Sequence, residues 1–175
     1  MILQCFFSFC YGLVHSQTMI NRIRLSIEKK YLTRCLYVKE YSQDYFPELL
    51  KVLCEMGHGD EIVIGDANFP AETYGKRVVR ADGLGGNQLL EAILELIPLD
   101  TYAEFNLMLM NTTNGDPTPE IWSTYKKTAS KDKNLKIRFL ERQEFYDRSK
   151  NAYAVVASGE EAVYANIILK KGVIK

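Results

Sequence analysis

A histidine between two glycines stands directly ahead of a short apolar run that ends at an aspartate. His58 lies within Gly57–Gly59, and Asp66 follows the apolar residues 62–64. Histidine exchanges protons near neutral pH, and glycine lets the backbone turn sharply and lets another molecule approach. This spacing therefore places a proton donor and a carboxylate around one short strand, as acid–base catalysis requires. For the Gly-His-Gly segment alone, a helix cap with a surface histidine is the simpler interpretation.

Polar side chains that could bind hydroxyl groups gather in the C-terminal half. A cation, two phenols and an amide are contributed by Arg142, Tyr146, Tyr164 and Asn166. Each of these groups donates or accepts hydrogen bonds in defined directions. The only other histidine is His15, so a metal site built from histidines is not expected. Taken alone, Asp66 also fits an Asx-type turn, and Tyr146 also fits a core position.

Composition favours one domain without nucleic acid as a partner. The chain has 175 residues, 47% of them hydrophobic and 25% charged, which is enough for a single core. Twenty-two basic residues balance twenty-two acidic ones, and no basic stripe interleaved with aromatics appears. The four cysteines form no Cys-x-x-Cys pair, so neither a zinc knuckle nor a disulfide framework is predicted, and a reducing cytoplasm is expected.

Residues 1–40 differ in character from the rest. Their apolar part, within residues 2–14, is too short for a transmembrane helix and lacks the charged start and cleavage site of a secretory signal. No membrane association is therefore expected. The segment is interpreted as an atypical extension, either disordered or arising from a misassigned start, with Met19 as an internal candidate. The second part of the chain, residues 41–175, is expected to form the domain.

Strand-like and helix-like patterns alternate from residue 47 onward, which predicts a single-domain α/β fold with helices packed on a sheet. Helices are expected at 47–56, 87–97, 119–130 and 142–150, and strands at 61–65, 77–80, 105–110, 136–140, 152–157 and 166–170. Residues 114–117 read as a turn, and residues 83–87 as a helix-entry loop, because they lack the Lys-Ser/Thr of a P-loop. Trp122 is expected to pack in the core.

Four separated, colinear blocks resemble the fucose mutarotase / D-ribose pyranase family. They are residues 56–62 (Met-Gly-His-Gly-Asp-Glu-Ile), 66–71 (Asp-Ala-Asn-Phe-Pro-Ala), 80–83 (Arg-Ala-Asp-Gly) and 164–173 (Tyr-Ala-Asn-Ile-Ile-Leu-Lys-Lys-Gly-Val). The resemblance covers about residues 46–175. The residues after His58 and after Asp66 are more similar to the fucose branch than to the ribose branch.

The resemblance implies interconversion of the α and β anomers of L-fucose by acid–base ring opening and closure, without a metal or organic cofactor, in support of fucose utilisation. It implies that His58 is the proton donor. The positions implied to bind the sugar are Asp66, Arg142, Tyr164, Ala165 and Asn166. Either Tyr164 or a water would accept the anomeric proton.

The resemblance also implies a ring-like homo-oligomer, similar to a decamer of two stacked pentamers, with the sugar site near a subunit boundary. Family members have no counterpart of residues 1–40. Two alternatives stay open at this point: a D-ribose pyranase, and a non-catalytic monosaccharide-binding protein in which no proton moves. The residues do not decide between L-fucose and D-ribose, because the discrimination depends on the orientation of single hydroxyl groups in the pocket.

Overall fold

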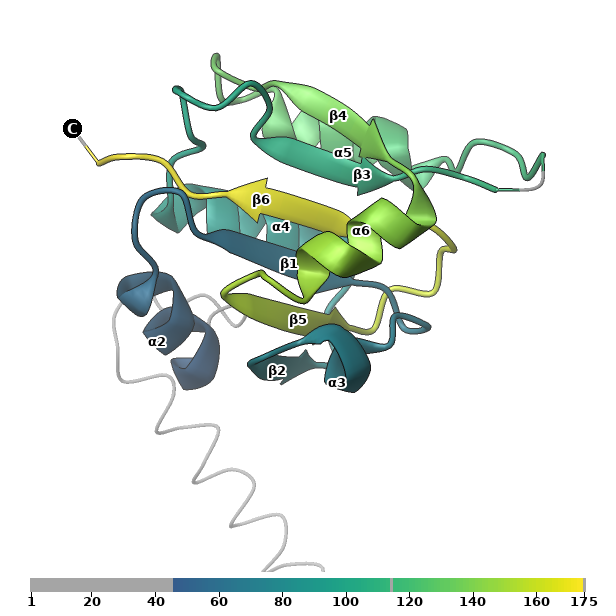
Figure 1. Cartoon of the computed structure of the whole chain (residues 1–175), viewed down its shortest axis with the longest axis horizontal. Helices are drawn as coiled ribbons and strands as arrows, with labels where there is room; N and C mark the ends of the chain where they lie inside the picture. The colour runs from purple at the N-terminus through teal and green to yellow at the C-terminus, as the bar shows by residue number, and fades with distance from the viewer. Residues whose placement is uncertain (1–45, 114, 175) are drawn as a thin grey trace, which may run out of the picture. The chain divides into compact units, whose positions relative to one another are not determined.

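The computed structural model describes residues 46–113 and 115–174, drawn in colour in Figure 1. The expected extension at 1–40 lies outside the described residues. Eleven elements follow one another along this part of the chain. The helices are α2 (Pro47–Glu55), α3 (Ala71–Tyr74), α4 (Gly86–Leu96), α5 (Ile121–Ala129) and α6 (Arg142–Ser149). The strands are β1 (Glu61–Gly65), β2 (Val78–Ala81), β3 (Leu107–Met110), β4 (Ile137–Leu140), β5 (Ala154–Ser158) and β6 (Ile167–Lys170).

The six strands form one mixed sheet in the order β2-β5-β1-β6-β3-β4. β1 pairs in parallel with β5, β2 pairs in parallel with β5, and β3 pairs in parallel with β4. β6 runs antiparallel to both of its neighbours, β1 and β3. Every strand except β6 therefore points the same way, and the carboxyl ends of five strands meet the amino end of β6 at one edge.

Both faces of the sheet are covered, because successive side chains of each strand point to opposite faces. In β1, Ile62 and Ile64 belong to one buried cluster and Val63 to the other. The same alternation separates Leu107 and Leu109 of β3 from its two methionines. Central strands buried on both faces need near-continuous apolar sequence, and this is what the interior strands of the sheet have.

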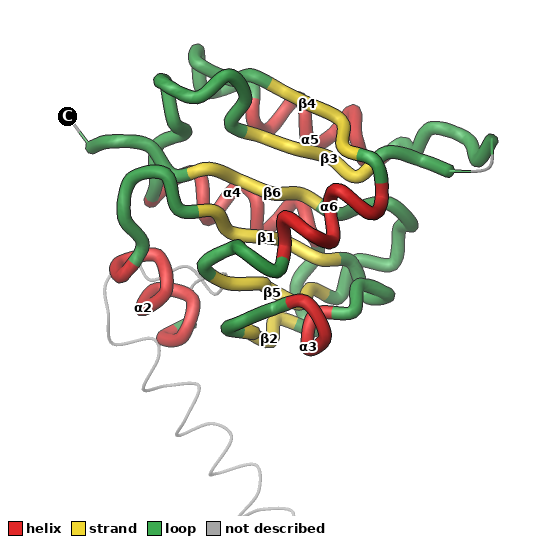
Figure 2. Tube along the Cα trace, in the orientation of Figure 1, coloured by secondary structure: helices red, strands yellow, loops and turns green. Residues whose placement is uncertain are grey.

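Helices lie on both sides of the sheet, as Figures 1 and 2 show, with α4 and α5 on one face and α6 on the other. α2, α4 and α5 contribute buried residues to the first cluster, among them Leu49, Leu89 and Tyr125. α3 and α6 contribute Ala71 and Phe145 to the second. The predicted single-domain α/β fold is confirmed.

Most of the predicted elements are present, with ends shifted by one or two residues. The predicted strand at 77–80 is β2 at Val78–Ala81, and the predicted strand at 105–110 begins only at Leu107. The short helix α3 was not predicted, because four residues are too few to show a helical period. The helix-entry loop before α4 and the core position of Trp122 are confirmed.

Candidate functional site

The carboxyl edge of the sheet holds a pocket of about 740 Å³, within the range of ~300–1,000 Å³ typical of small-molecule sites. Its lining includes Asp66, Arg142, Tyr164 and Asn166. These residues come from the end of β1, the start of α6 after β4, and the segment entering β6. Because these ends meet at one edge, the topology brings together residues that lie up to a hundred positions apart. Ligands of open α/β sheets bind at this kind of edge.

Asp66 and Asn166 form a reciprocal pair in the floor of the pocket. The Asp66 backbone N–H donates to Asn166 Oδ1 at 2.8 Å, and Asn166 Nδ2 donates to Asp66 Oδ2, also at 2.8 Å. The Asn68 backbone N–H donates to the other carboxylate oxygen at 3.0 Å. Asp66 therefore both forms the Asx-type turn and supplies a carboxylate to the pocket, so the two interpretations of its sequence context hold together.

Burial raises the pKa of Asp66, and the hydrogen bonds from the Asn68 N–H, the Asn166 amide and the Ala165 backbone only partly offset it. Asp66 is 5% exposed and Asn166 4% exposed. Ala165 itself is fully buried, so its contribution to the site is through the backbone. Two buried polar side chains that fix each other's direction suit a site that must distinguish hydroxyl groups.

Tyr164 occupies the left-handed region of the backbone map, with φ of 58°. Its hydroxyl lies 2.5 Å from Asp116 Oδ2 and 3.0 Å from Thr113 Oγ1. Asp116 also lines the pocket, although its segment was predicted only as a turn. The Asn-Gly-Asp-Pro composition that marks a turn gave no signal that the carboxylate would meet a tyrosine far along the chain.

Arg142 is the first residue of α6 and is exposed at the pocket. A cation at a helix N-terminus opposes the helix dipole at a cost of about 0.3–1 kcal/mol. Helix stability therefore does not explain an arginine at this position. Binding of an electron-rich ligand in the pocket would explain it. Tyr146 and Phe69 form the apolar wall of the same pocket, with ring centroids 5.8 Å apart. Tyr146, which also fitted a core position, is thus half-buried against the pocket.

His58 lies at the other end of β1 from Asp66, ahead of the strand rather than after it. At about 3.3 Å per residue, the five residues of β1 alone separate the two edges by roughly 13 Å. His58 does not line the pocket. One chain thus brings together Asp66, Arg142, Tyr164 and Asn166, and places His58 on the opposite edge of the sheet.

His58 has a defined setting of its own. Its Nε2 lies 3.2 Å from Asp100 Oδ1, and its ring meets that of Tyr102 edge to face at 5.9 Å between centroids. Burial raises the pKa of Asp100, but hydrogen bonds from the Tyr102 N–H and His58 outweigh it, so that pKa lies below its ordinary value. An ionised carboxylate only accepts, so Nε2 carries a proton and Nδ1 faces elsewhere. The imidazole itself is half-exposed, open to an incoming group.

The turn that carries His58 is fixed from beneath by Lys171. Lys171 Nζ donates to the carbonyls of Leu53 at 2.8 Å and Met56 at 2.6 Å, which end α2. The Gly59 N–H donates to the Lys171 carbonyl at 2.9 Å, and Gly59 has φ of 87°, which suits glycine. The glycine after the histidine is therefore required by the turn.

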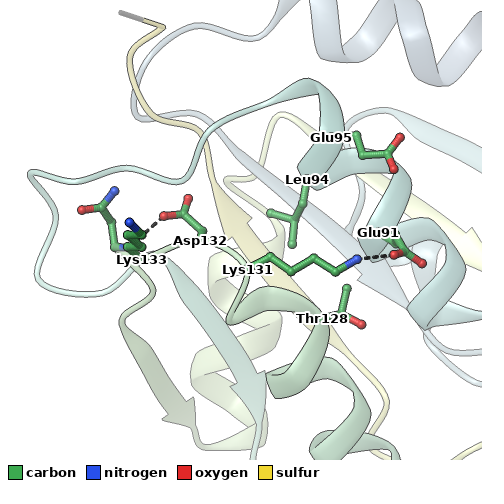
Figure 3. A pocket seen from close by; sticks show the side chains of 8 residues that line it. Glu91, Leu94, Glu95, Thr128, Lys131, Asp132 and Lys133 are labelled. Atoms are coloured by element: carbon green, nitrogen blue, oxygen red, sulfur yellow. Dashed lines mark hydrogen bonds and ion pairs between the residues drawn. The ribbon is translucent and has the colours of Figure 1, made fainter.

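A second hollow, of about 470 Å³, lies between α4 and the segment after α5. Figure 3 shows Lys131 reaching across it to Glu91, with Leu94 above the Lys131 side chain in this view. Its lining includes the Lys131–Glu91 ion pair, and none of the sequence-predicted site residues lies there. The pocket at the carboxyl edge is therefore the candidate site.

Within residues 46–113 and 115–174, no helix is long and apolar enough to cross a membrane. The same residues place no group of three or more His, Cys, Asp or Glu side chains where they could hold a metal ion.

A mixed α/β sheet with such a pocket at its carboxyl edge defines a protein that binds small polar molecules. The chain belongs to the RbsD / FucU transport protein family, whose sequence model matches residues 45–174.

Relatives match this part of the chain over nearly their whole length. Fucose mutarotase of Homo sapiens is 48% identical over 137 residues, covering 73% of this chain and 88% of the relative. L-fucose mutarotase of Actinobacillus pleuropneumoniae (serotype 5b, strain L20) is 50% identical over 130 residues, covering 73% and 90%. Among solved structures, fucose mutarotase of Streptococcus pneumoniae in complex with L-fucose superposes with a TM-score of 0.76 at 47% identity, covering 79% of this chain and all of that one. The predicted family is confirmed.

Proposed function

We propose that this protein is an L-fucose mutarotase, an isomerase that interconverts the α and β anomers of L-fucose. The observation that carries the proposal is the pocket itself, in which a carboxylate, a guanidinium, a phenol and an amide converge beside an aromatic wall. These are the groups that bind a monosaccharide's hydroxyls by directed hydrogen bonds. Relatives named for this activity are 48–50% identical to the chain.

The reaction needs two proton transfers and no redox change. A proton must reach the ring oxygen and another must leave the anomeric hydroxyl, while the bond from the anomeric carbon to the ring oxygen breaks. The aldehyde then turns and the ring closes on its other face. Groups that donate and accept near the working pH serve both directions, and positioned groups of this kind typically contribute ~10²–10⁴-fold.

We assign the roles by chemistry. His58 donates to the ring oxygen, because imidazole changes its charge near neutral pH. Asp66 and Arg142 hold sugar hydroxyls by charge-assisted bonds, and Asn166 keeps Asp66 in its orientation. Tyr164 lies at the pocket, where it can meet the anomeric hydroxyl. The Ala165 backbone supports the floor.

The separation of His58 from the pocket supports an assembly in which the site is shared. Both are at sheet edges of one chain, but at opposite ones, so a sugar in the pocket is out of reach of the same chain's imidazole. We propose a homo-oligomer, a decamer of two stacked pentamers, in which His58 of one copy completes the pocket of another, working in the cytoplasm. Its half-exposed imidazole is available for that purpose.

Mixing two inactive variants tests the shared site. His58→Ala leaves the pocket intact, and Arg142→Ala leaves the imidazole intact. After co-refolding, some sites in the mixed oligomers join an intact pocket to an intact imidazole, and anomer exchange should return to a measurable fraction of the wild-type rate. Exchange that stays at the level of the separate variants, in oligomers shown by native mass spectrometry to be mixed, would contradict the shared site.

The rival function is binding of a monosaccharide without catalysis. L-fucose titration together with anomer exchange distinguishes the two, since a binding protein shifts sugar resonances without speeding exchange between the anomers. The same measurement with D-ribose tests the pyranase alternative. The fucose proposal requires faster exchange for L-fucose than for D-ribose at equal protein concentration.

A further inference from the structure

Tyr164 is held in a conformation that a tyrosine rarely adopts. It is the one non-glycine residue with positive φ among those that the structure describes. For a bulky side chain such a backbone is a strained exception, and it persists only where the surroundings impose it. Strained residues of this kind cluster at ligand and catalytic sites.

Three contacts impose this conformation. The Trp122 indole Nε1 donates to the Tyr164 carbonyl at 2.9 Å, from a ring that is itself 5% exposed. The Tyr164 hydroxyl then lies between Asp116 and Thr113, at 2.5 Å and 3.0 Å. These hydrogen bonds hold both the backbone carbonyl and the phenol of Tyr164, so the phenol oxygen is fixed in a residue that lines the pocket.

The distance to Asp116 has the length of a charge-assisted O–H···O⁻ bond, about 2.5–2.7 Å. A carboxylate accepts only, so the phenol proton points to Asp116 Oδ2. The remaining lone pairs of the phenol oxygen then accept, either from the hydroxyl of Thr113 or from a hydroxyl brought by a ligand. This geometry prepares Tyr164 to accept a proton.

We propose that Asp116 takes the phenol proton of Tyr164 as Tyr164 takes the anomeric proton, so that the two residues together form the base of the anomer exchange. This inference rests on the proposed mutarotase function. The sequence left either Tyr164 or a water as the acceptor of the anomeric proton, and this proposal selects Tyr164.

The step balances. The anomeric O–H bond breaks and its proton passes to the Tyr164 oxygen, while the proton already on that oxygen passes to Asp116 Oδ2. The electron pair of the broken O–H bond forms the aldehyde C=O. The bond to the ring oxygen breaks, and that oxygen takes a proton from the imidazolium of His58. Reclosure runs the same transfers backwards, so Asp116 ends as a carboxylate and His58 as it began.

Asp116 suits this role better than the other carboxylate of the pocket. Both oxygens of Asp66 already accept hydrogen bonds from the protein, from the Asn68 N–H and the Asn166 amide. Asp66 is also 5% exposed, whereas Asp116 lines the same pocket and is exposed. Asp66 is thus fixed as a binding group, whereas Asp116 already accepts the phenol hydrogen bond through which the Tyr164 proton would reach it.

The test compares Asp116→Asn with the wild type in L-fucose anomer exchange, measured over a range of sugar concentrations. Asparagine keeps an oxygen that accepts the phenol hydrogen bond but does not take up the proton. The inference predicts kcat lower by ~10²-fold or more, the loss typical when a general base is removed, with KM nearly unchanged. Asp116→Glu should recover part of kcat. The control Asp147→Asn, on the exposed face of α6, should match the wild type.

Tyr164→Phe and the double variant complete the set. If the two residues act as one unit, the double variant should be no slower than the slower single variant. Wild-type kcat in Asp116→Asn, or a change confined to KM, would overturn the inference while leaving the mutarotase function standing. Absence of exchange in the wild-type protein would overturn the proposed function and this inference with it.

Discussion

Replacing Lys171 with methionine should destabilise the protein through the end of α2. The Lys171 ammonium donates to the carbonyls of Leu53 and Met56, and the residue is only 8% exposed. Carbonyls in the last turn of a helix have no donor within the helix. Methionine keeps the length of the stem and removes the donor, leaving two carbonyls unpaired at about 1–3 kcal/mol each.

The desolvation cost of the buried ammonium partly offsets the loss in the free energy of unfolding. Burying an ammonium costs several kcal/mol, and methionine relieves that cost. We therefore expect a net loss of about 2–4 kcal/mol in the free energy of unfolding, the lower part of the range for two unpaired carbonyls. The matched control is Lys170→Met. Lys170 Nζ lies 3.9 Å from Glu61 with a side chain 26% exposed, a pair expected to contribute at most ~1 kcal/mol.

Urea unfolding measures both variants, at one protein concentration because assembly changes apparent stability. The Lys171→Met variant should unfold at clearly lower urea than Lys170→Met. It should also lose anomer exchange, since the turn bearing His58 rests on this residue. Equal midpoints for the two variants would refute the assignment of Lys171 as the residue that fixes the end of α2.

Two further predictions concern Asp66 and a glycine contact. Burial raises the pKa of Asp66 above its ordinary 3.8, so native stability should fall as pH rises from there through the raised value. Asp66→Asn should lack that fall in thermal unfolding across the acidic range; an unchanged pH profile would contradict it. A Cβ on Gly159 would meet the Asp82 carbonyl at 2.1 Å, whereas one on Gly83 would meet nothing within 4 Å. Gly159→Ala should therefore cost ~1–3 kcal/mol in urea unfolding and Gly83→Ala far less; equal costs would refute this.

The sequence was sufficient for the elements and for most of the pocket. Apolar runs of strand length and helical spacing placed most strands and helices, because most elements here are either buried on both faces or have one apolar side. The family resemblance implied one set of binding positions: Asp66, Arg142, Tyr164, Ala165 and Asn166. All of them except Ala165 line the pocket, because the ends of their strands share an edge.

Other features depend on contacts that a linear pattern does not contain. The role of Asp116 depends on a tyrosine in another segment, and the Asn-Gly-Asp-Pro composition around it suggests only a turn. The short helix α3 has too few residues to show a period. His58 and Asp66 are separated because one precedes β1 and the other follows it. That His58 lies outside the pocket of its own chain becomes evident only once the pocket is located at the Asp66 end of β1.

The most direct test of the proposed function is saturation-transfer NMR of L-fucose at anomeric equilibrium, with the unaltered protein and with His58→Ala. Saturating the α-anomeric proton should attenuate the β-anomeric signal in proportion to wild-type protein concentration, and His58→Ala should return the transfer to that of buffer alone while still binding the sugar. Transfer at the buffer level with the wild-type protein, or at the wild-type level with His58→Ala, would contradict catalysis of anomer exchange through His58.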